Sequence, residues 1–232
     1  MQRAHQSLEL VRFAAPTKDM QITRFVVNMI QENCYLAWDD KQEAVLIDCG
    51  AFHPEERKAI SDFIAAHHLK LTHLLNTHGH FDHVFGAQFV HDTYGVDIEL
   101  CADERETYEQ AAQQMSQFLH LDYPLTLPPV GKYFKDGDII KVGKMQFRVI
   151  ETPGHTPGGV CFYEEKEHVL FSGDSLFRHE IGRCDLPGGD EASLIHALKT
   201  RVLTLPDDVQ VLPGHGPATT VGEERGLNYY LR

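Results

Sequence analysis

The 232-residue sequence lacks several features that mark other classes of protein. It has no run of basic residues, and 21 Lys and Arg stand against 34 Asp and Glu, a formal net charge of −13. We therefore expect neither nucleic acid nor an anionic membrane surface as a partner. No stretch approaches the ~20 apolar residues of a membrane span, and the first residues have no apolar core of signal-peptide length.

Cysteine is scarce and shows no paired spacing. The five cysteines are Cys34, Cys49, Cys101, Cys161 and Cys184. No two of them have the C-x-x-C spacing of a thiolate zinc site or a dithiol redox centre. An odd number of widely spaced thiols fits a reducing compartment. Together with the missing membrane and signal patterns, this predicts a cytoplasmic protein.

Linkers and low-complexity tracts are also missing, and 42% of the residues are hydrophobic. This composition predicts one compact domain with a full core, which we expect to span residues 20–232. Residues 1–19 show no strong periodicity. They are either an accessory N-terminal extension of uncertain order or residues added by a translation start upstream of Met20.

Short β-rich runs followed by amphipathic segments occur twice along the chain. In the first half we expect a meander of strands at 22–28, 34–38 and 44–48, further strands at 72–76 and 97–100, helices at 54–68, 82–94 and 102–120, and a long loop over 121–137. In the second half we expect strands at 138–142, 145–151, 159–165, 168–173 and 209–213, with helices at 190–203 and 222–231. Sheets followed by helices in both halves predict an α/β fold, a four-layer αββα sandwich.

The strongest local signal is THGHFDH, residues 77–83, directly after an apolar strand. Two histidines at i and i+2 cannot share a helix face, so His78 and His80 need a loop, and Gly79 supplies the backbone freedom for it. Asp82 and His83 then lie on the first turn of a helix. Imidazoles and carboxylates form the ligand set that Zn²⁺ prefers. The alternative is a His-rich polar turn, but without a cation the crowded groups would lack partners.

Three further segments repeat this pattern of an apolar strand followed by a small-residue loop. They place His155 in TPGHTPGG, Asp174 in FSGDS and His215 in LPGHGP. No packing reason requires a His in the Gly/Pro loop that holds His155, so a surface turn is the weaker interpretation there. Asp174 taken alone is more typical of an ordinary turn. If the four strand ends meet at one edge of the sandwich, however, five His and two Asp suffice for two metals that share one carboxylate.

The order H-x-H-x-D-H, then a His, an Asp and a final His, resembles the metallo-β-lactamase superfamily from about Met20 onward. The segments THGHFDH, TPGHTPGG, GDSLF with IGRCDLPGGD, and LPGHGPAT are most similar to its glyoxalase II (hydroxyacylglutathione hydrolase) branch. The resemblance implies that His78, His80 and His155 hold one metal, that Asp82, His83 and His215 hold the other, and that Asp174 bridges both. It also implies that Asp48 orients the metal loop.

One departure from the branch concerns the C-terminus. Full-length members carry a helical domain that grips glutathione, whereas 17 residues follow His215 in this sequence. The chain therefore resembles the short, single-domain members, and glutathione recognition stays open.

The expected activity is hydrolysis of a small-molecule acyl thioester or related ester with two divalent ions, Zn²⁺ first and Fe or Mn as alternatives. A metal-bridging hydroxide, available because bound water reaches a pKa of about 7, would attack the carbonyl carbon. Asp174 would bridge the metals, and Asp82 would orient the nucleophile or shuttle its proton. A thiolate, with a thiol pKa of about 8.5, leaves without an added acid. Arg178 and Arg183 either bind a substrate carboxylate or are solvated surface residues.

Several other activities share this scaffold. A mononuclear iron persulfide dioxygenase is the leading alternative, because ligand residues alone do not fix the metal. A nuclease would need a basic track, which the net charge opposes, and a lactonase is a further member of the same group. β-Lactamase activity is the less favoured interpretation, because those enzymes are secreted and carry a signal peptide. A non-enzymatic metal-binding or scaffold protein would be expected to have lost a ligand, and all seven ligand residues are present in this sequence.

Overall fold

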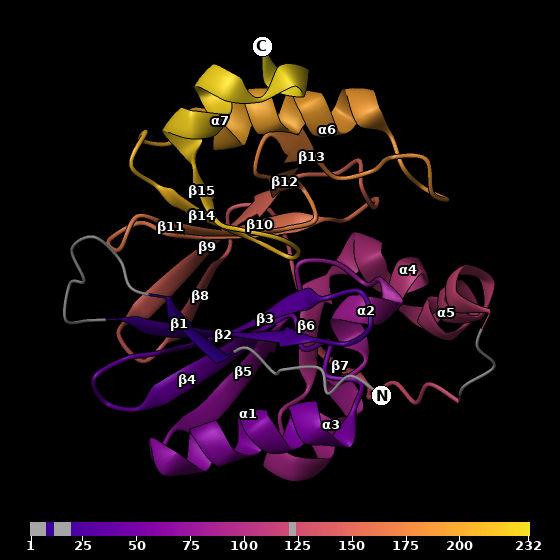
Figure 1. The fold of residues 1–232 in the computed structure, drawn as a ribbon, viewed down its shortest axis with the longest axis vertical. Helices are drawn as coiled ribbons and strands as arrows, with labels where there is room; N and C mark the ends of the chain where they lie inside the picture. The colour runs from indigo at the N-terminus through magenta and orange to yellow at the C-terminus, as the bar shows by residue number, and fades with distance from the viewer. Residues whose placement is uncertain (1–7, 12–19, 121–123) are drawn as a thin grey trace.

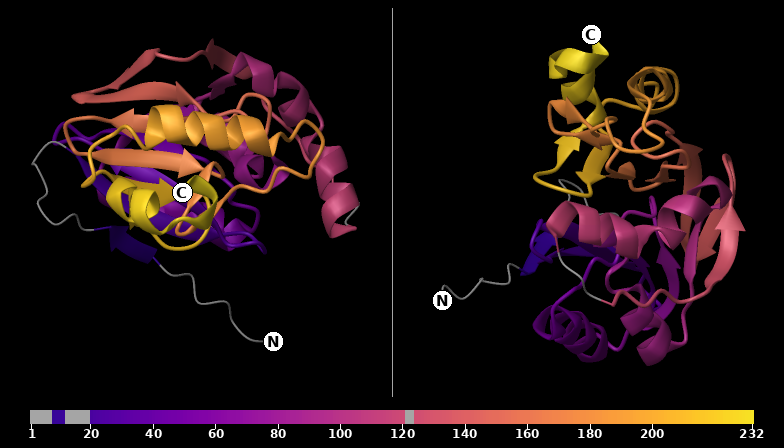
Figure 2. Two further views of the ribbon diagram at one scale, coloured as in Figure 1. Left: turned by 90° about the horizontal axis from the view of Figure 1, so that it is seen from above. Right: turned by 90° about the vertical axis from the view of Figure 1, so that its right-hand side faces the viewer.

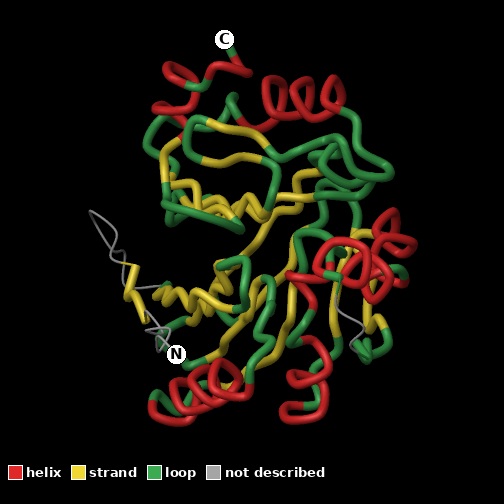
Figure 3. Tube along the Cα trace, turned by 45° about the vertical axis from the view of Figure 1, so that its right-hand side comes forward, coloured by secondary structure: helices red, strands yellow, loops and turns green. Residues whose placement is uncertain are grey.

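The computed structural model describes residues 8–11, 20–120 and 124–232. Two β-sheets pack face to face, and helices cover the outer face of each (Figures 1 and 3). This confirms the predicted four-layer αββα sandwich. Of the expected N-terminal extension, residues 8–11 form a strand, and residues 1–7 and 12–19 lie outside the described residues.

The first sheet has seven strands in chain order. They are β1 (Leu8–Val11), β2 (Gln21–Val27), β3 (Glu32–Trp38), β4 (Glu43–Ile47), β5 (Lys70–Leu75), β6 (Ile98–Cys101) and β7 (Val130–Phe134). The pairs from β1 to β4 are antiparallel, which confirms the expected meander of β2, β3 and β4. The pairs from β4 to β7 are parallel, so the carboxyl ends of β4 and β5 lie at the same edge.

The second sheet has the order β15-β14-β11-β10-β9-β8. Its strands are β8 (Ile139–Val142), β9 (Met145–Glu151), β10 (Val160–Glu164), β11 (Val169–Gly173), β14 (Gln210–Pro213) and β15 (Thr219–Thr220). Only β11 and β14 pair in parallel. A separate two-stranded hairpin joins β12 (Leu176–Phe177) to β13 (Glu180–Ile181).

Strand β10 shows how the second sheet is buried on both faces. Val160 and Phe162 belong to the core cluster shared with the first sheet, whereas Cys161 and Tyr163 belong to the cluster that contains Leu194 of the outer helix layer. This alternation is the period of two expected for a strand. Aromatic contacts join the sheets across the central layer, such as Phe134 of β7 with Phe162 of β10, whose ring centroids are 5.4 Å apart.

Helices α1 (Pro54–Ala66) and α3 (Ala87–Tyr94) cover the first sheet, and α6 (Glu191–Ala197) and α7 (Val221–Leu227) cover the second (Figures 1 and 2). Helix α1 has Pro at its first turn as expected. Gly95, with φ 66°, ends α3. The π-helical turn η2 (Leu198–Val202) extends α6, and the 3₁₀ turn η3 (Tyr229–Leu231) follows α7. No helix in the described ranges is long and apolar enough to cross a membrane.

Three sequence-based boundaries were wrong. The helix expected at 82–94 is split into α2 (Phe81–Val84) and α3, because the Gly86 N–H turns to donate to the Cys49 carbonyl at 2.7 Å. The helix expected at 102–120 is split into the 3₁₀ turn η1 (Ala102–Glu104), α4 (Arg105–Glu109) and α5 (Ala111–Leu119). The loop expected at 121–137 contains β7, whose backbone pairs with β6.

Candidate metal centre

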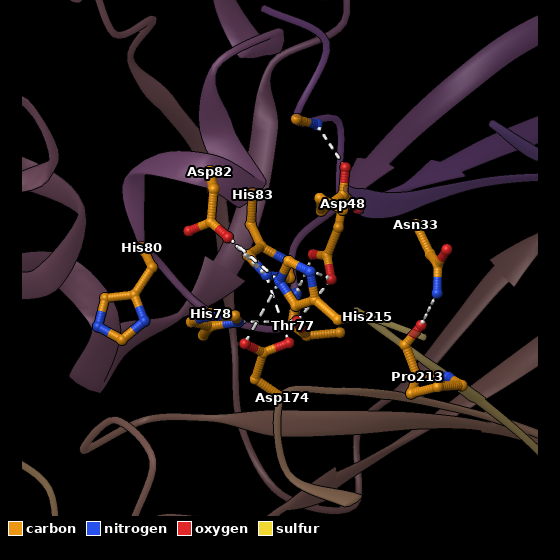
Figure 4. A network of polar contacts seen from close by, with 12 residues as sticks. Asn33, Asp48, Thr77, His78, His80, Asp82, His83, Asp174, Pro213 and His215 are labelled. Carbon is orange, nitrogen blue, oxygen red and sulfur yellow. Dashed lines mark hydrogen bonds and ion pairs between the residues drawn. The ribbon is translucent and has the colours of Figure 1, made fainter. Parts of the chain in front are cut away.

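The loops that follow four strands meet at one edge of the sandwich. His78 and His80 follow β5, His155 follows β9, Asp174 follows β11 and His215 follows β14. Backbone hydrogen bonds connect the two sheets here, including Val160 N–H to the Thr77 carbonyl at 2.9 Å and Asn33 N–H to the Gly214 carbonyl at 2.7 Å. Figure 4 shows Asp174 pointing toward Asp82, His83 and His215.

His78, His80 and His155 form a group that we call the histidine triad; a further possible group, Asp48, His78 and His83, overlaps it. One ligand atom from each lies within 4.8 Å of the others. The Nδ1 of His80 is 3.0 Å from the Nε2 of His155. In two of these residues, the ring nitrogen that faces away from the triad has a partner in the protein. His155 Nδ1 lies 2.7 Å from the Arg183 carbonyl, and His78 Nδ1 lies 3.0 Å from the Thr77 hydroxyl. The inner Nε2 of His78 is buried without a hydrogen-bond partner.

Asp82, His83 and His215 form the second, or mixed, triad, also with ligand atoms within 4.8 Å of one another. The Nε2 of His215 is 3.2 Å from Asp82 Oδ2, and the Nε2 of His83 is 3.6 Å from the same oxygen. The outer Nδ1 of His215 lies 3.2 Å from the Ile30 carbonyl. This triad therefore combines a carboxylate with two imidazoles at ion-pair distances.

Asp174 lies between the two triads. Its Oδ2 is 3.6 Å from His155 Nε2 and 3.7 Å from His215 Nε2, and its Oδ1 is 3.4 Å from His83 Nε2. Gly214 makes room for it, because a Cβ at that position would lie 2.3 Å from Asp174 Oδ1. One carboxylate thus reaches ligand atoms of both sets.

The protonation of the two triads differs. Burial lowers the pKa of His78 well below its ordinary value, and burial together with the neighbouring His155 lowers the pKa of His80 to about 4. In the mixed triad burial also opposes charge, but the carboxylates outweigh it and raise the pKa of both His83 and His215. His78 and His80 are therefore neutral at pH 7, whereas the raised pKa values of His83 and His215 favour their charged forms.

The carboxylates shift in the complementary direction. Burial alone would favour their neutral forms, but the charge of His83, followed by contacts with His215, lowers the pKa of Asp82 and of Asp174. Both acids are therefore ionised at neutral pH and able to act as ligands.

Asp48, expected to orient the metal loop, lies directly behind the site. Its Oδ1 accepts from the Thr77 N–H and its Oδ2 from the Thr77 hydroxyl, each at 2.7 Å. Its Oδ2 is also 3.1 Å from Nδ1 of His83. Its backbone has φ 49°, in the left-handed region that costs energy for a residue other than glycine. These contacts are those an orienting residue would make, and the role itself stays a prediction.

Sequence reasoning missed several buried polar residues behind the site. Asn28 donates from its side chain to the carbonyls of Gly50 and Asp82, each at 3.0 Å. Glu32 accepts from the Gly50 N–H at 3.1 Å, and burial raises its pKa well above the ordinary value. Glu104 joins two of the ligand loops. None of these residues stands in a motif, so only the tertiary structure reveals their contacts.

Arg178 and Arg183 both have carboxylate partners within the chain. Arg178, at the tip of the β12–β13 hairpin, pairs with Glu223 at 3.1 Å, and Arg183 pairs through two nitrogens with Asp185 at 2.7 and 2.8 Å. Both guanidinium groups are about half exposed. Arg183 reaches the metal centre through its backbone carbonyl, which contacts His155. A role for either side chain in substrate binding stays a prediction.

Comparison with known proteins decides the family. The sequence profile of the Metallo-beta-lactamase superfamily matches residues 27–215. The chain belongs to the metallo-β-lactamase superfamily. Among its relatives, the hydroxyacylglutathione hydrolase GloC of Haemophilus influenzae is 37% identical over 215 residues, with 91% of this chain and 98% of the relative covered.

Two solved structures of the superfamily match over most of their length. The BLEG-1 B3 metallo-beta-lactamase has a TM-score of 0.83 at 35% identity, with 90% of this chain and 99% of that chain covered. TTHA1623 in a di-iron-bound form has a TM-score of 0.79 at 36% identity, covering 89% and 98%. Membership in this superfamily indicates a metal-dependent hydrolase and implies divalent metal ions at the His/Asp cluster.

The residues present fit such ions. Besides Nε2 of His78, both Nε2 of His83 and Oδ1 of Asp174 are buried without a hydrogen-bond partner. Buried polar atoms of this kind are rare unless an ion or water satisfies them. Imidazole nitrogens and carboxylate oxygens suit Zn²⁺, Fe²⁺ and Mn²⁺.

Proposed function

We propose that this chain is a binuclear metal-dependent hydrolase that cleaves a thioester or related ester. The arrangement that carries the proposal is two adjacent triads with one carboxylate, Asp174, within reach of both. His78, His80 and His155 would hold one ion, and Asp82, His83 and His215 the other. Zn²⁺ is the first choice because of the ligand set, with Fe or Mn as alternatives.

The chain's own residues would divide the remaining work. When bound, the two ions would supply Lewis acidity toward a carbonyl oxygen and lower the pKa of water. Asp174 would fix the distance between the two sets of ligands. Asp82, ionised and 3.2 Å from His215 Nε2, would orient the attacking water and accept or return its proton. Thioesters suit this site because a thiolate leaves without a proton donor.

The substrate class is supported by similarity over nearly the full length of one relative. The Haemophilus influenzae protein carries hydroxyacylglutathione hydrolysis in its name, and the match covers 98% of it. The resemblance is therefore not confined to a shared metal-binding module. We infer that a small hydroxyacyl thioester is the substrate.

The test couples metal content to turnover in one preparation. The zinc-loaded chain is assayed for release of thiol from S-D-lactoylglutathione, while bound zinc is measured by mass spectrometry. We expect hydrolysis that requires two ions per chain, ends on chelation and returns when zinc is restored. Absence of thioester hydrolysis in a protein that holds two ions would contradict the proposal.

Two rival activities are separated by the same preparation. A β-lactamase is favoured by the 35% identity to a B3 enzyme, so penicillin is included as a second substrate. Turnover of penicillin above that of the thioester would replace our proposal with that activity. An iron persulfide dioxygenase would instead bind one iron per chain and consume oxygen with glutathione persulfide.

A further inference from the structure

Glu104 is a fully buried carboxylate that joins two loops of the metal centre. It ends η1, the turn that follows β6. Its Oε2 accepts from the N–H of Gly79, and its Oε1 accepts from the N–H of Gly158, each at 2.7 Å. A single side chain thus connects segments that lie 79 residues apart in the sequence.

The same two glycines lie unusually close to the segment that carries Glu104. A Cβ at Gly79 would lie 2.7 Å from the backbone nitrogen of Tyr108, and a Cβ at Gly158 would lie 2.8 Å from the backbone nitrogen of Glu104. Neither glycine has a positive φ. Glycine is therefore required at both positions for close approach and not for an unusual turn, which corrects the reason inferred for Gly79 from the sequence.

The two loops held in this way carry the histidine triad. Gly79 lies between His78 and His80, and Gly158 lies three residues after His155. A shift of either loop relative to η1 would change the distances among the three imidazoles, because Glu104 is hydrogen-bonded to both loops.

The mixed triad is supported by different groups. The side chain of Asn28 donates to the backbone carbonyl of Asp82, and the carbonyl of Ile30 lies 3.2 Å from His215 Nδ1. Asp48 lies beside His83. Glu104 takes part in none of these contacts. Asp48 also holds Thr77, whose hydroxyl lies 3.0 Å from His78 Nδ1, so it contacts both triads. The hydrogen bonds of Glu104, in contrast, go to the two loops of the histidine triad.

A buried carboxylate also carries a desolvation cost that an apolar side chain would avoid. Burial raises the pKa of Glu104, against the hydrogen bonds that favour its charged form. Its presence at this point is therefore not explained by packing alone, whereas the two backbone N–H groups explain it directly.

We propose that Glu104 is a positioning residue that fixes the spacing of His78, His80 and His155 and so sets the affinity of that triad for a divalent ion, without affecting the mixed triad. The inference rests on the metal centre of the proposed function, but not on the reaction it performs.

The experiment is a calorimetric titration of the metal-free chain with Zn²⁺. Outer contacts of metal ligands typically change affinity by about 10- to 100-fold. We expect Glu104→Ala to weaken one of two sites by that factor and to leave the other unchanged. With Co²⁺ in place of Zn²⁺, the visible absorption of one site should change and that of the other should not.

Double variants identify the affected site. In an Asp82→Ala background the histidine triad is intact, and adding Glu104→Ala should weaken the remaining strong site. In a His80→Ala background, adding Glu104→Ala should change the affinity of the mixed triad by less than about twofold, since the hydrogen bonds of Glu104 to Gly79 and Gly158 include no residue of that triad.

Two further variants guard against a general loss of structure. Glu104→Gln keeps the side-chain volume and one acceptor oxygen. It should therefore recover part of the affinity of the histidine triad for Zn²⁺. If the alanine variant fails to fold, the glutamine variant provides the test. Glu224→Ala is the matched control, because Glu224 is also fully buried and accepts from the His179 N–H at 2.9 Å and the Thr219 hydroxyl at 2.7 Å. It should leave both affinities unchanged.

Equal weakening of both sites, or wild-type affinity at both in the alanine and glutamine variants, would overturn the proposal. A lack of thioester hydrolysis with the site-selective effect intact would remove only the proposed reaction. The two ideas can therefore fail separately.

Discussion

The two triads of this centre lie side by side but are held in different states. In the histidine triad, lowered pKa values keep His78 and His80 neutral at pH 7, and His80 Nδ1 lies 3.0 Å from His155 Nε2. In the mixed triad, charged imidazoles face carboxylates, as His215 faces Asp82 at 3.2 Å. Both sets contain a buried imidazole nitrogen without a hydrogen-bond partner, Nε2 of His78 in the first and Nε2 of His83 in the second. The second set differs because it contains a carboxylate of its own, Asp82, whose charge offsets that of the imidazoles.

Because the histidines of the two triads differ in protonation, metal binding requires the release of more protons from one triad than from the other. A cation entering the histidine triad meets lone pairs that are already free at pH 7, because the pKa values of His78 and His80 are lowered. A cation entering the mixed triad has to displace protons from His83 and His215, whose pKa values are raised. The first triad is thus arranged for binding in advance, and the second exchanges one set of charge pairs for another.

The largest effect should come from removing the residue common to both triads. Asp174→Ala takes away a carboxylate that lies within 3.7 Å of nitrogens from both sets. We expect thioester hydrolysis to fall by about 1000-fold or more, since loss of metal assistance costs several kcal/mol in the transition state. Bound zinc should fall well below two per chain. Turnover near the wild-type rate would show that the triads act independently of this carboxylate.

A smaller effect should follow from crowding the mixed triad without removing a ligand. In Gly214→Ala the new Cβ would lie 2.3 Å from Asp174 Oδ1 and 2.7 Å from His83 Cε1. We expect kcat to fall by about 100-fold, the effect of displacing reacting groups by about 1 Å. Bound metal should be lost from the mixed triad first.

The control for this variant is Gly226→Ala in α7, where a Cβ would meet nothing within 4 Å. Because alanine favours helix, this change should leave kcat unaltered and raise the free energy of unfolding by at most about 1 kcal/mol. Equal losses in both variants would mean that Gly214 acts through general stability and not through Asp174.

The sequence was sufficient for the layers of the fold and for the residues that gather at its edge. Apolar alternation identified strands such as β9 and β10, and a His or Asp after each strand end is visible in the chain itself. Local signals failed where tertiary contacts decide the backbone. The helix breaks at Gly86 because its N–H donates to the Cys49 carbonyl. Strand β7 forms because its backbone pairs with that of β6.

The supports of the site were beyond sequence reasoning for the same cause. Glu104 and Asn28 stand in no motif, and each forms hydrogen bonds with backbone groups that are distant in the sequence and come close only on folding. Short strands such as β12 and β15, with two residues each, are too brief for any periodicity. The spacing of the metal ligands can be recognised in the sequence, whereas the residues that hydrogen-bond to the ligand loops can be identified only from the tertiary structure.

The opposite pKa shifts give the two triads opposite pH effects on the metal-free protein. The pKa of His80 is lowered to about 4, so the stability it contributes is present above pH 6.5 and is lost as pH falls toward 4, by no more than about 3 kcal/mol. The pKa values of His83 and His215 are raised, so their contribution is complete below pH 6.5 and is lost as pH rises through the folded values.

Urea unfolding of the metal-free chain across pH 4.5 to 9 would measure both effects. We expect His80→Gln to flatten the acid side of the stability profile and His215→Gln to flatten the alkaline side. If His215→Gln altered only the acid side, the ion pairs inferred for the mixed triad would be absent in solution.

The smallest effect should come from the arginine next to the histidine triad. The guanidinium of Arg183 is exposed and already paired with Asp185, so a substrate carboxylate would gain at most about 1 kcal/mol from it, the value of an exposed ion pair. Arg183→Ala should therefore raise KM for S-D-lactoylglutathione by up to about fivefold. Because the contact to His155 uses the backbone carbonyl, which alanine retains, kcat should stay within about twofold. If Arg178→Ala raised KM instead, the anionic end of the substrate would lie beside the β12–β13 hairpin.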